Sequence, residues 1–338
     1  MQRRLLDYVV ITLKGIAMGA ADVVPGVSGG TIAFISGIYE ELITSINNVN
    51  LSLLKTLKTN GLSAAWKQLN GNFLLALVIG IAISLLSLAK GIEWLLHHQP
   101  VLLWSFFFGL VLASVLFIGK QITKWSLVTI FGAIAAAFLA YYITTLPSMS
   151  SNDSSWFLFI AGALAICAMI LPGISGAFIL VLLGAYGPVL QAINNRDIKT
   201  IAIIGAGAIV GLLSFSKLLK WLFTHYKNLT LAILTGFIFG SLNKIWPWKK
   251  TIQVFDKTTN TEIPFSEVSD LATLSVFQLQ NNDFETLKMI QEVNISPIHY
   301  SELNQYLVNE QLNYAIILMV VGFLTIFILE KLGAQKND

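Results

Sequence analysis

The sequence has little of the chemistry that soluble enzymes use. It contains a single cysteine, Cys167, which excludes an internal disulfide and any metal site built from several cysteines. P-loop and dinucleotide-binding fingerprints are absent, and the histidines, His97, His98, His225 and His299, do not follow a metal-binding spacing. The sequence therefore predicts a protein that is not an enzyme and that holds no metal and no cofactor.

Charged residues are also scarce, at 12% of the 338 residues, whereas a soluble domain carries about 25%. Hydrophobic residues make up 55% and recur in runs that approach the roughly 20 residues needed to cross a bilayer. The apolar segments are 5–22, 26–46, 72–96, 101–118, 127–146, 156–171, 174–193, 200–223, 229–242 and 313–330. Asp7 and Lys14 interrupt the first segment, so we expect it to be retained rather than cleaved as a signal peptide.

An internal duplication centres on one short phrase. At an offset of 147 residues, Pro25-Gly26-Val27-Ser28-Gly29 falls on Pro172-Gly173-Ile174-Ser175-Gly176. At an offset of 127, a second group of residues matches in the same way: Gly80 with Gly207, Lys90 with Lys217, Trp94 with Trp221, His98 with His225, and Gly109 with Gly236. The change of offset means that the loop near 46–72 is longer in the first copy than in the second.

Each copy holds an odd number of apolar segments, so the second copy should lie upside down relative to the first. We expect transmembrane repeat 1 at 1–150 and transmembrane repeat 2 at 151–338, with a polar, extracytoplasmic insertion at 243–312. The predicted fold is an all-α polytopic membrane protein with two inverted repeats, each a Pro-Gly-broken, re-entrant helical hairpin plus three transmembrane helices. The sequence leaves open whether the broken segments cross the membrane fully.

The positive-inside rule places the N-terminus in the cytoplasm. On that topology the short outer loops keep only Lys90, Arg196 and Lys199. The cytoplasmic side collects most of the cations: Arg3, Arg4, Lys55, Lys58, Lys67, Lys120, Lys124, Lys217, Lys220, Lys227, Lys331 and Lys336. The net charge of +3, with most cations on one side, therefore indicates orientation in a bilayer, and we expect no nucleic-acid partner.

The two Pro-Gly phrases are the candidate site. A proline inside a helix costs about 3 kcal/mol and a glycine about 1 kcal/mol, so two such breaks in apolar sequence indicate a purpose. A helix that starts after a break presents free backbone N–H groups and a partial positive charge, which suit a phosphate. The predicted phosphate-binding residues are Pro25, Gly26, Ser28, Gly29, Gly30, Thr31, Gly173, Ser175 and Gly176. The alternative is that Pro-Gly makes a tight loop and that the small residues only let helices pack closely.

Ionisable residues inside membrane segments are further candidates. Lys90 and Lys217 occupy equivalent places and could each neutralise a phosphate that arrives from one face, or could snorkel beside a tryptophan at the membrane boundary. Asp22, Lys14 and Glu40 are candidates for coupling to a proton or a cation, although Asp22 could instead cap the local backbone.

These motifs resemble those of the PopT family of undecaprenyl phosphate translocases, formerly a membrane family of unknown function. The residues that carry the resemblance are Lys14-Gly15, Met18-Gly19, Asp22, Pro25 to Thr31, Gly37-Ile38-Tyr39, Phe106 to Leu110, Leu171 to Gly176, Gly184-Ala185-Tyr186 and Gly240 to Trp248. The resemblance implies a transporter of the bacterial cytoplasmic membrane that returns polyprenyl phosphate from the outer to the inner leaflet for cell-wall synthesis.

Two other readings remain at this stage. A secondary transporter of a small soluble anion would use the same helix ends, and an enzyme acting on lipid phosphate would need a nucleophile beside a base. We expect polyprenyl phosphate and membrane lipids as partners, while a homo-oligomer stays open. Segment 243–312 is expected to be a covering without direct chemistry, or to shape lipid access or contact another envelope protein.

Overall fold

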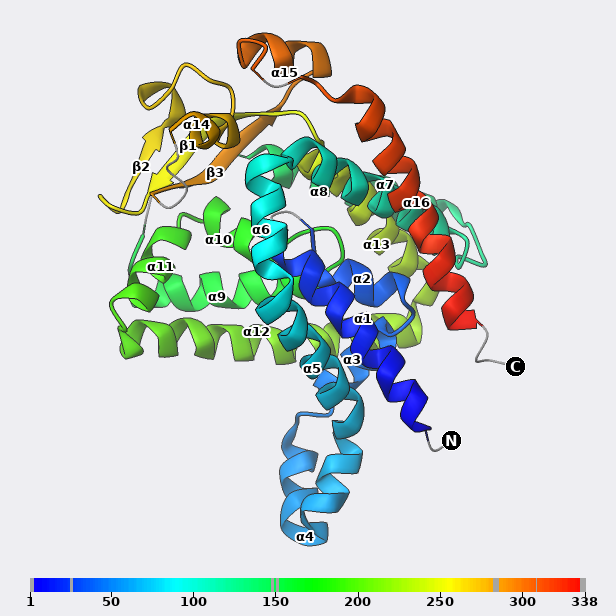
Figure 1. The fold of residues 1–338 in the computed structure, drawn as a ribbon. Helices are drawn as coiled ribbons and strands as arrows, with labels where there is room; N and C mark the ends of the chain where they lie inside the picture. The colour runs from blue at the N-terminus through cyan, green and yellow to red at the C-terminus, as the bar shows by residue number, and fades with distance from the viewer. Residues whose placement is uncertain are drawn as a thin grey trace.

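The computed structural model describes residues 3–24, 27–146, 149, 152–281, 286–307 and 309–334. Helices dominate it, and a small lobe with a β-sheet sits at one end (Figure 1). The helices of the first half are α1 (Leu5–Val23), α2 (Gly29–Ile35), α3 (Tyr39–Asn47), α4 (Leu51–Gln68), α5 (Gly71–Ser87), α6 (Ala89–His98), α7 (Pro100–Gly119) and α8 (Leu127–Thr145). Those of the second half are α9 (Ser155–Ile170), α10 (Gly176–Leu182), α11 (Tyr186–Asn194), α12 (Ile198–His225), α13 (Lys227–Ser241), the short 3-10 helix η1 (Leu242–Ile245) and α16 (Leu312–Ala334).

The prediction of membrane-spanning helices is confirmed for some of the helices named above. Among the described residues, four helices are long and apolar enough to cross a membrane: α7, α8, α12 and α13, the last extended to Ile245. The number rises to six if each of two bent pairs counts as one span, α4 with α5 (51° bend) and α10 with α11 (110° bend). The chain is a mostly helical, multi-pass membrane protein, as the composition predicts.

Equivalent helices of the two halves pack in equivalent pairs. Helix α1 lies along α5 as α9 lies along α12, and α7 lies along α16 as α13 lies along α8. Equivalent glycines sit at these contacts: a Cβ on Gly80 would meet the carbonyl oxygen of Thr12, and one on Gly207 would meet that of Phe159. Glycine is required there because the helix backbones approach too closely for any side chain.

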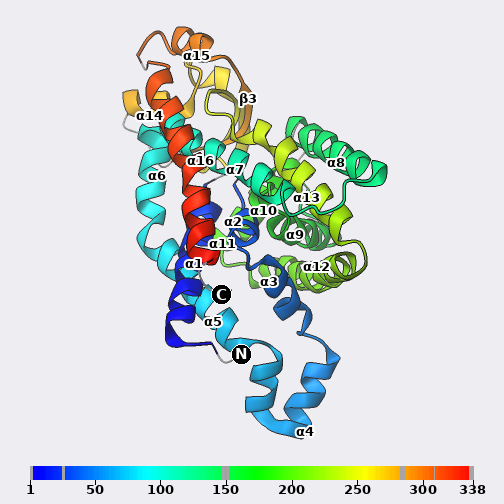
Figure 2. The same ribbon diagram turned by 90° about the vertical axis from the view of Figure 1, so that its right-hand side faces the viewer.

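The two halves are interleaved rather than separate, because α7 packs on α16 and α8 on α13. Three segments that were each expected to form one helix contain two helices instead, namely 26–46, 72–96 and 174–193. Segment 72–96 forms α5 and α6, which meet at Leu88, whereas the equivalent α12 is continuous. The long loop near 46–72 contains α4, which bends at Gly61 (φ +80°) and projects away from the other helices (Figures 1 and 2).

The lobe, residues 249–307, corrects the expectation of an all-α protein. Strands β1 (Lys249–Asp256), β2 (Thr261–Pro264) and β3 (Leu287–Asn294) form an antiparallel sheet in the order β2-β1-β3. The 3-10 helix η2 (Phe265–Glu267) and helices α14 (Leu274–Asn281) and α15 (Pro297–Leu303) complete it. The sheet forms because β1 is rich in β-branched and aromatic residues, and Val254 and Phe265 are buried in a core of the lobe's own.

The lobe and the start of α1 lie on opposite sides of the molecule, and α16 runs from the lobe side back toward the α1 side (Figure 1). We call these the lobe face and the α1 face. Ion pairs between Arg3 and Glu41 and between Lys227 and Glu40 join elements on the α1 face. The lobe is fixed to α6 by the 2.7 Å contact of His97 Nδ1 with Gln278 Oε1.

Candidate functional site

Each Pro-Gly phrase lies where a helix stops. Helix α1 ends at Val23 and α2 begins at Gly29, while α9 ends at Ile170 and α10 begins at Gly176. Segments 26–46 and 174–193, expected as single apolar segments, each contain two short helices instead. The reason is a glycine further along each copy, Gly37 (φ +73°) or Gly184 (φ +66°). Its left-handed backbone ends α2 or α10 after seven residues.

The structure brings the two breaks into direct contact. Ser28 Oγ donates to the carbonyl oxygens of Met169 (3.1 Å) and Leu171 (3.3 Å). In the other direction, the backbone N–H of Gly173 donates to Thr31 Oγ1 at 2.9 Å. Ser28 and Thr31 are almost completely buried, with exposed fractions of 0% and 1%. Residues that lie far apart in the sequence therefore form one polar contact in the protein interior.

The donors at the start of α2 are occupied within the protein. The N–H of Gly29 donates to Asp22 Oδ1 at 2.6 Å, and that of Gly30 donates to Ser28 Oγ at 3.1 Å. Asp22 thus caps the positive end of α2 with its own negative charge, as the capping alternative predicted. In this conformation a phosphate can reach that helix end only if the Asp22 carboxylate moves aside. The phosphate-binding role of the residues 28–31 stays a prediction.

The second break is capped differently. Ser175 Oγ accepts the N–H of Phe178 at 3.2 Å, and Ser175 is 9% exposed. Gly176 lies against α9, where a Cβ would come within 2.7 Å of the carbonyl oxygen of Ala165. Small residues therefore serve close packing here as well, which agrees with the packing alternative without excluding a ligand. Pro25 and Gly26, the remaining predicted residues of the first break, lie outside the described residues.

The two ends of α2 are both held by charged groups of α1. Asp22 accepts from the first turn of α2, and Lys14 Nζ donates to the carbonyl oxygen of Ser36, directly after its last turn, at 2.6 Å. A carboxylate at the N-terminus and an ammonium at the C-terminus both stabilise the helix dipole. The residues equivalent to Lys14 and Asp22 in the second copy are Ala161 and Met169, so α10 lacks this clamp.

The other predicted cations do not join the breaks. Lys90 on α6 and Lys217 on α12 are exposed, and no hydrogen bond or ion pair links either one to the breaks among the described residues. Trp94 stacks on His98 with ring centroids 4.6 Å apart, consistent with a place at the membrane boundary. Glu40 is exposed and pairs with Lys227 at 2.9 Å, so it does not share a site with Asp22.

Residues 26–30 also match the Gly-x-Ser-x-Gly pattern of serine hydrolases. That pattern needs a turn from a strand into a helix, with the serine exposed. Ser28 instead lies between two helices, is fully buried, and donates its hydroxyl to two carbonyl oxygens. Its geometry is that of a helix cap. In the part of the chain that the structure describes, no group of three or more His, Cys, Asp or Glu side chains could hold a metal ion.

The sequence reasoning missed one polar feature. Lys244 and Lys249 line a pocket between the lobe and helices α8 and α10. Lys244 belongs to the run Gly240 to Trp248 that carries part of the family resemblance, and this run was the available signal. Nothing in the sequence shows that Lys249 is buried, because its burial depends on the folded lobe.

Comparison with known proteins gives a consistent result. Residues 18–263 match the family model VCA0040-like, described as undecaprenyl phosphate translocase-like. A polyprenyl-phosphate transporter of Vibrio cholerae serotype O1 is 47% identical over 287 residues, which cover 85% of this chain and 90% of that protein. A polyprenyl-phosphate transporter of Staphylococcus aureus is 33% identical over 255 residues, which cover 70% of this chain and 85% of that protein. No solved structure matches the chain.

Proposed function

Because the chain belongs to the undecaprenyl phosphate translocase-like family, we propose that it moves undecaprenyl phosphate from the outer to the inner leaflet of the bacterial cytoplasmic membrane. The lipid carrier would then be used again in envelope glycan synthesis. Family membership is the observation that carries this proposal, and it favours a transporter over an enzyme.

Translocation has to move a charged headgroup through hydrocarbon. Without help this transfer is expensive, because nothing in the hydrocarbon replaces the hydrogen bonds and the hydration that the phosphate has in water. The meeting of the two breaks supports their role in lowering this cost. Ser28, Thr31 and Gly173 bring hydroxyl and N–H groups of both halves together at a buried point. The headgroup would pass between these two breaks.

We infer an inverted repeat with the N-terminus in the cytoplasm and the lobe outside. The equivalent helix pairs, with Gly80 and Gly207 at equivalent contacts, support the duplication. The position of the lobe opposite the start of α1 is compatible with the orientation that the cations predict (Figure 1). The lobe face would then receive the lipid and the α1 face would release it.

The unequal clamping of the two short helices supports an alternating-access mechanism. Asp22 and Lys14 hold α2 in place, whereas α10 has no such charged partners at these positions. We propose that α10 moves, with Gly184 as the hinge, and that its movement parts the contacts of Ser28 with Leu171 and of Thr31 with Gly173, in the segment directly before α10.

Asp22 is the proposed coupling residue. Its carboxylate and a phosphate compete for the N–H groups at the start of α2, because two anions at one helix end repel each other. Protonation of Asp22 would remove the competing charge and would let the headgroup bind. Translocation would then depend on the proton gradient.

The experiment is headgroup accessibility in proteoliposomes that contain polyprenyl phosphate. With the purified protein, a phosphatase added outside should reach the headgroups of both leaflets, whereas in protein-free liposomes it should reach only those of the outer leaflet. Uptake of radioactive inorganic phosphate by the same proteoliposomes tests transport of a soluble anion. Uptake of phosphate without any change in lipid accessibility would contradict the proposed function.

A further inference from the structure

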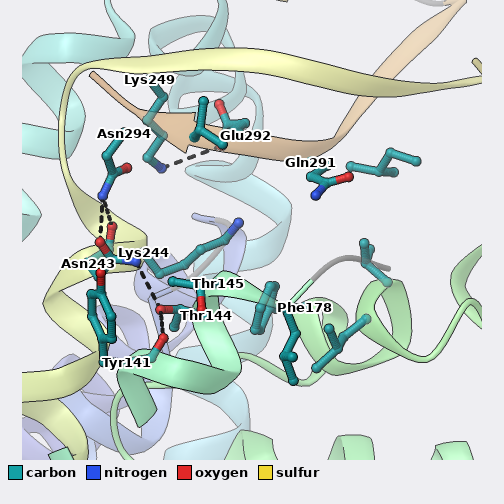
Figure 3. A pocket seen from close by; sticks show the side chains of 15 residues that line it. Tyr141, Thr144, Thr145, Phe178, Asn243, Lys244, Lys249, Gln291, Glu292 and Asn294 are labelled. Carbon is teal, nitrogen blue, oxygen red and sulfur yellow. Dashed lines mark hydrogen bonds and ion pairs between the residues drawn. The ribbon is translucent and has the colours of Figure 1, made fainter. Parts of the chain in front are cut away.

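A polar pocket lies between the lobe and the membrane helices on the lobe face (Figure 3). Its volume is about 260 Å³, and its walls come from the end of α8, from α10 and η1, and from strands β1 and β3. Its charged lining residues are Lys244, Lys249 and Glu292, so two positive charges face one negative charge. Such a pocket is an attractive site for an anion.

Lys249 is the more buried of the two lysines. It is 4% exposed, and among the described residues its Nζ has no hydrogen-bond partner. The nearest opposite charge is Glu292 Oε2 at 3.5 Å, and the Trp104 ring centroid also lies 3.5 Å from Nζ. Burial lowers the pKa of Lys249 to about 8, although the charge of Glu292 partly offsets this effect. A buried ammonium group with unused donors is costly unless a further acceptor is supplied.

Lys244 connects the pocket with the second break. Its side chain extends from η1 toward α10 (Figure 3), and its Nζ lies 4.7 Å from the centre of the Phe178 ring. The N–H of Phe178 is the group that Ser175 caps at the start of α10. An anion held by Lys244 would therefore lie beside the first turn of the helix that we expect to move.

An apolar groove continues from this pocket. The groove has a volume of about 550 Å³ and lies between α7, α8 and α13, and it shares Tyr141 and Asn243 with the pocket. Its walls include Ala137, Phe138 and Phe239. Phe138 and Phe239 are 70% and 55% exposed, so the groove lies on the outer surface of the helices, which faces lipid in a membrane.

A third cavity extends the groove away from the lobe. It has a volume of about 590 Å³, shares Val115 and Thr235 with the groove, and reaches Lys120 and Trp125 at the far ends of α7 and α8. Shared lining residues thus connect a cationic pocket on the lobe face, an apolar groove and a second region with a lysine. A lipid with one phosphate and a long apolar tail matches this sequence of environments.

We propose that the pocket of Lys244 and Lys249 receives the phosphate monoester headgroup of a polyprenyl phosphate, and that the groove between α8 and α13 holds the first part of its tail. The substrate class rests on the proposed function. The lobe is then part of the binding site rather than a mere cover. The site lies on the lobe face, before the headgroup reaches the two breaks.

The test is binding to the full-length protein in detergent. The probes are farnesyl phosphate, which has the headgroup and a short tail, inorganic phosphate, which has no tail, and farnesol, which has no phosphate. We expect Lys244→Gln and Lys249→Gln each to weaken farnesyl phosphate binding at least about tenfold, because each removes a charged donor. Lys250→Gln is the matched control, since Lys250 is the exposed neighbour of Lys249 on β1 and should leave binding unchanged.

The groove is tested with Ala137→Phe, which fills part of its volume, against Ala135→Phe on the exposed surface of α8. Only Ala137→Phe should weaken farnesyl phosphate binding, and neither should change the binding of inorganic phosphate. Farnesol should bind more weakly than farnesyl phosphate. The melting temperature of each variant in detergent establishes that it is folded before its binding is compared.

Unchanged farnesyl phosphate affinity in both folded lysine variants would overturn the headgroup site. Equal affinity for inorganic and farnesyl phosphate, with no effect of Ala137→Phe, would assign the pocket to free phosphate and would overturn the lipid site. These failures are separable from failure of the proposed function. If only the headgroup site is wrong, wild-type protein still translocates lipid in proteoliposomes. If the pocket binds free phosphate, the lipid accessibility assay shows separately whether the protein translocates lipid.

Discussion

Replacing Ser28 with alanine should lower the free energy of unfolding more than the equivalent change at Ser175. Ser28 Oγ caps the N–H of Gly30 and also donates to Met169 and Leu171. Because Gly30 is buried, its N–H cannot form a hydrogen bond with water in the Ser28→Ala variant. We therefore expect the loss of this cap to cost the upper end of the capping range, about 2 kcal/mol. The lost hydrogen bond across the breaks adds about 1 kcal/mol.

Ser175→Ala removes only the cap on Phe178 at a position that is 9% exposed, so about 1 kcal/mol is expected. The difference between the two variants should therefore be about 2 kcal/mol in the free energy of unfolding. Reversible unfolding in mixed detergent, followed by tryptophan fluorescence, measures both. Ser28→Thr is the control, because threonine keeps a capping hydroxyl. Equal destabilisation by Ser28→Ala and Ser175→Ala would refute the asymmetry and the contact on which it rests.

Three further results are expected. Gly37→Ala should cost about 1–2 kcal/mol, because alanine strains at φ +73°, and Gly37→Asn should cost less; equal melting temperatures for both variants and wild type would contradict this. Binding of farnesyl phosphate should weaken as the pH rises from 7 to 9, because Lys249, with a pKa of about 8, loses its charge in this range; Lys249→Arg should flatten this profile, and a profile that Lys249→Arg leaves unchanged would exclude Lys249 as its source. Asp22→Asn keeps an acceptor for Gly29 but cannot take up a proton at its former carboxylate, so translocation should no longer respond to an imposed pH gradient; an undiminished response in proteoliposomes would remove Asp22 from the coupling.

The sequence predicted the features that depend on local chemistry. A helix was expected to start after each Pro-Gly phrase, and α2 and α10 begin at Gly29 and Gly176. The duplication also predicted equivalent glycines, and Gly80 and Gly207 indeed lie at equivalent helix contacts. The left-handed helix ends at Gly37 and Gly184 were missed, although a glycine that interrupts an apolar run is a signal for such an end.

Features that depend on contacts between distant segments could not be predicted in the same way. The hydrogen bonds of Ser28 with Met169 and Leu171 join residues 141 and 143 positions apart. The sequence allowed Asp22 either a coupling or a capping role, and only the fold shows that it occupies the start of α2. The pocket of Lys244 and Lys249 requires the lobe to fold onto α8 and α10, and no local pattern encodes that arrangement.

Whether the two breaks must part for a headgroup to pass can be measured by cross-linking them. In a Cys167→Ala background, which removes the only native thiol, Ser28→Cys and Leu171→Cys would be joined with a short, cleavable bifunctional reagent. Polyprenyl phosphate translocation in proteoliposomes should stop when the link forms and return when it is cleaved, while the reagent should leave each single-cysteine variant at the rate it had before treatment. Translocation at an unchanged rate by the cross-linked protein would contradict passage of the headgroup between the breaks.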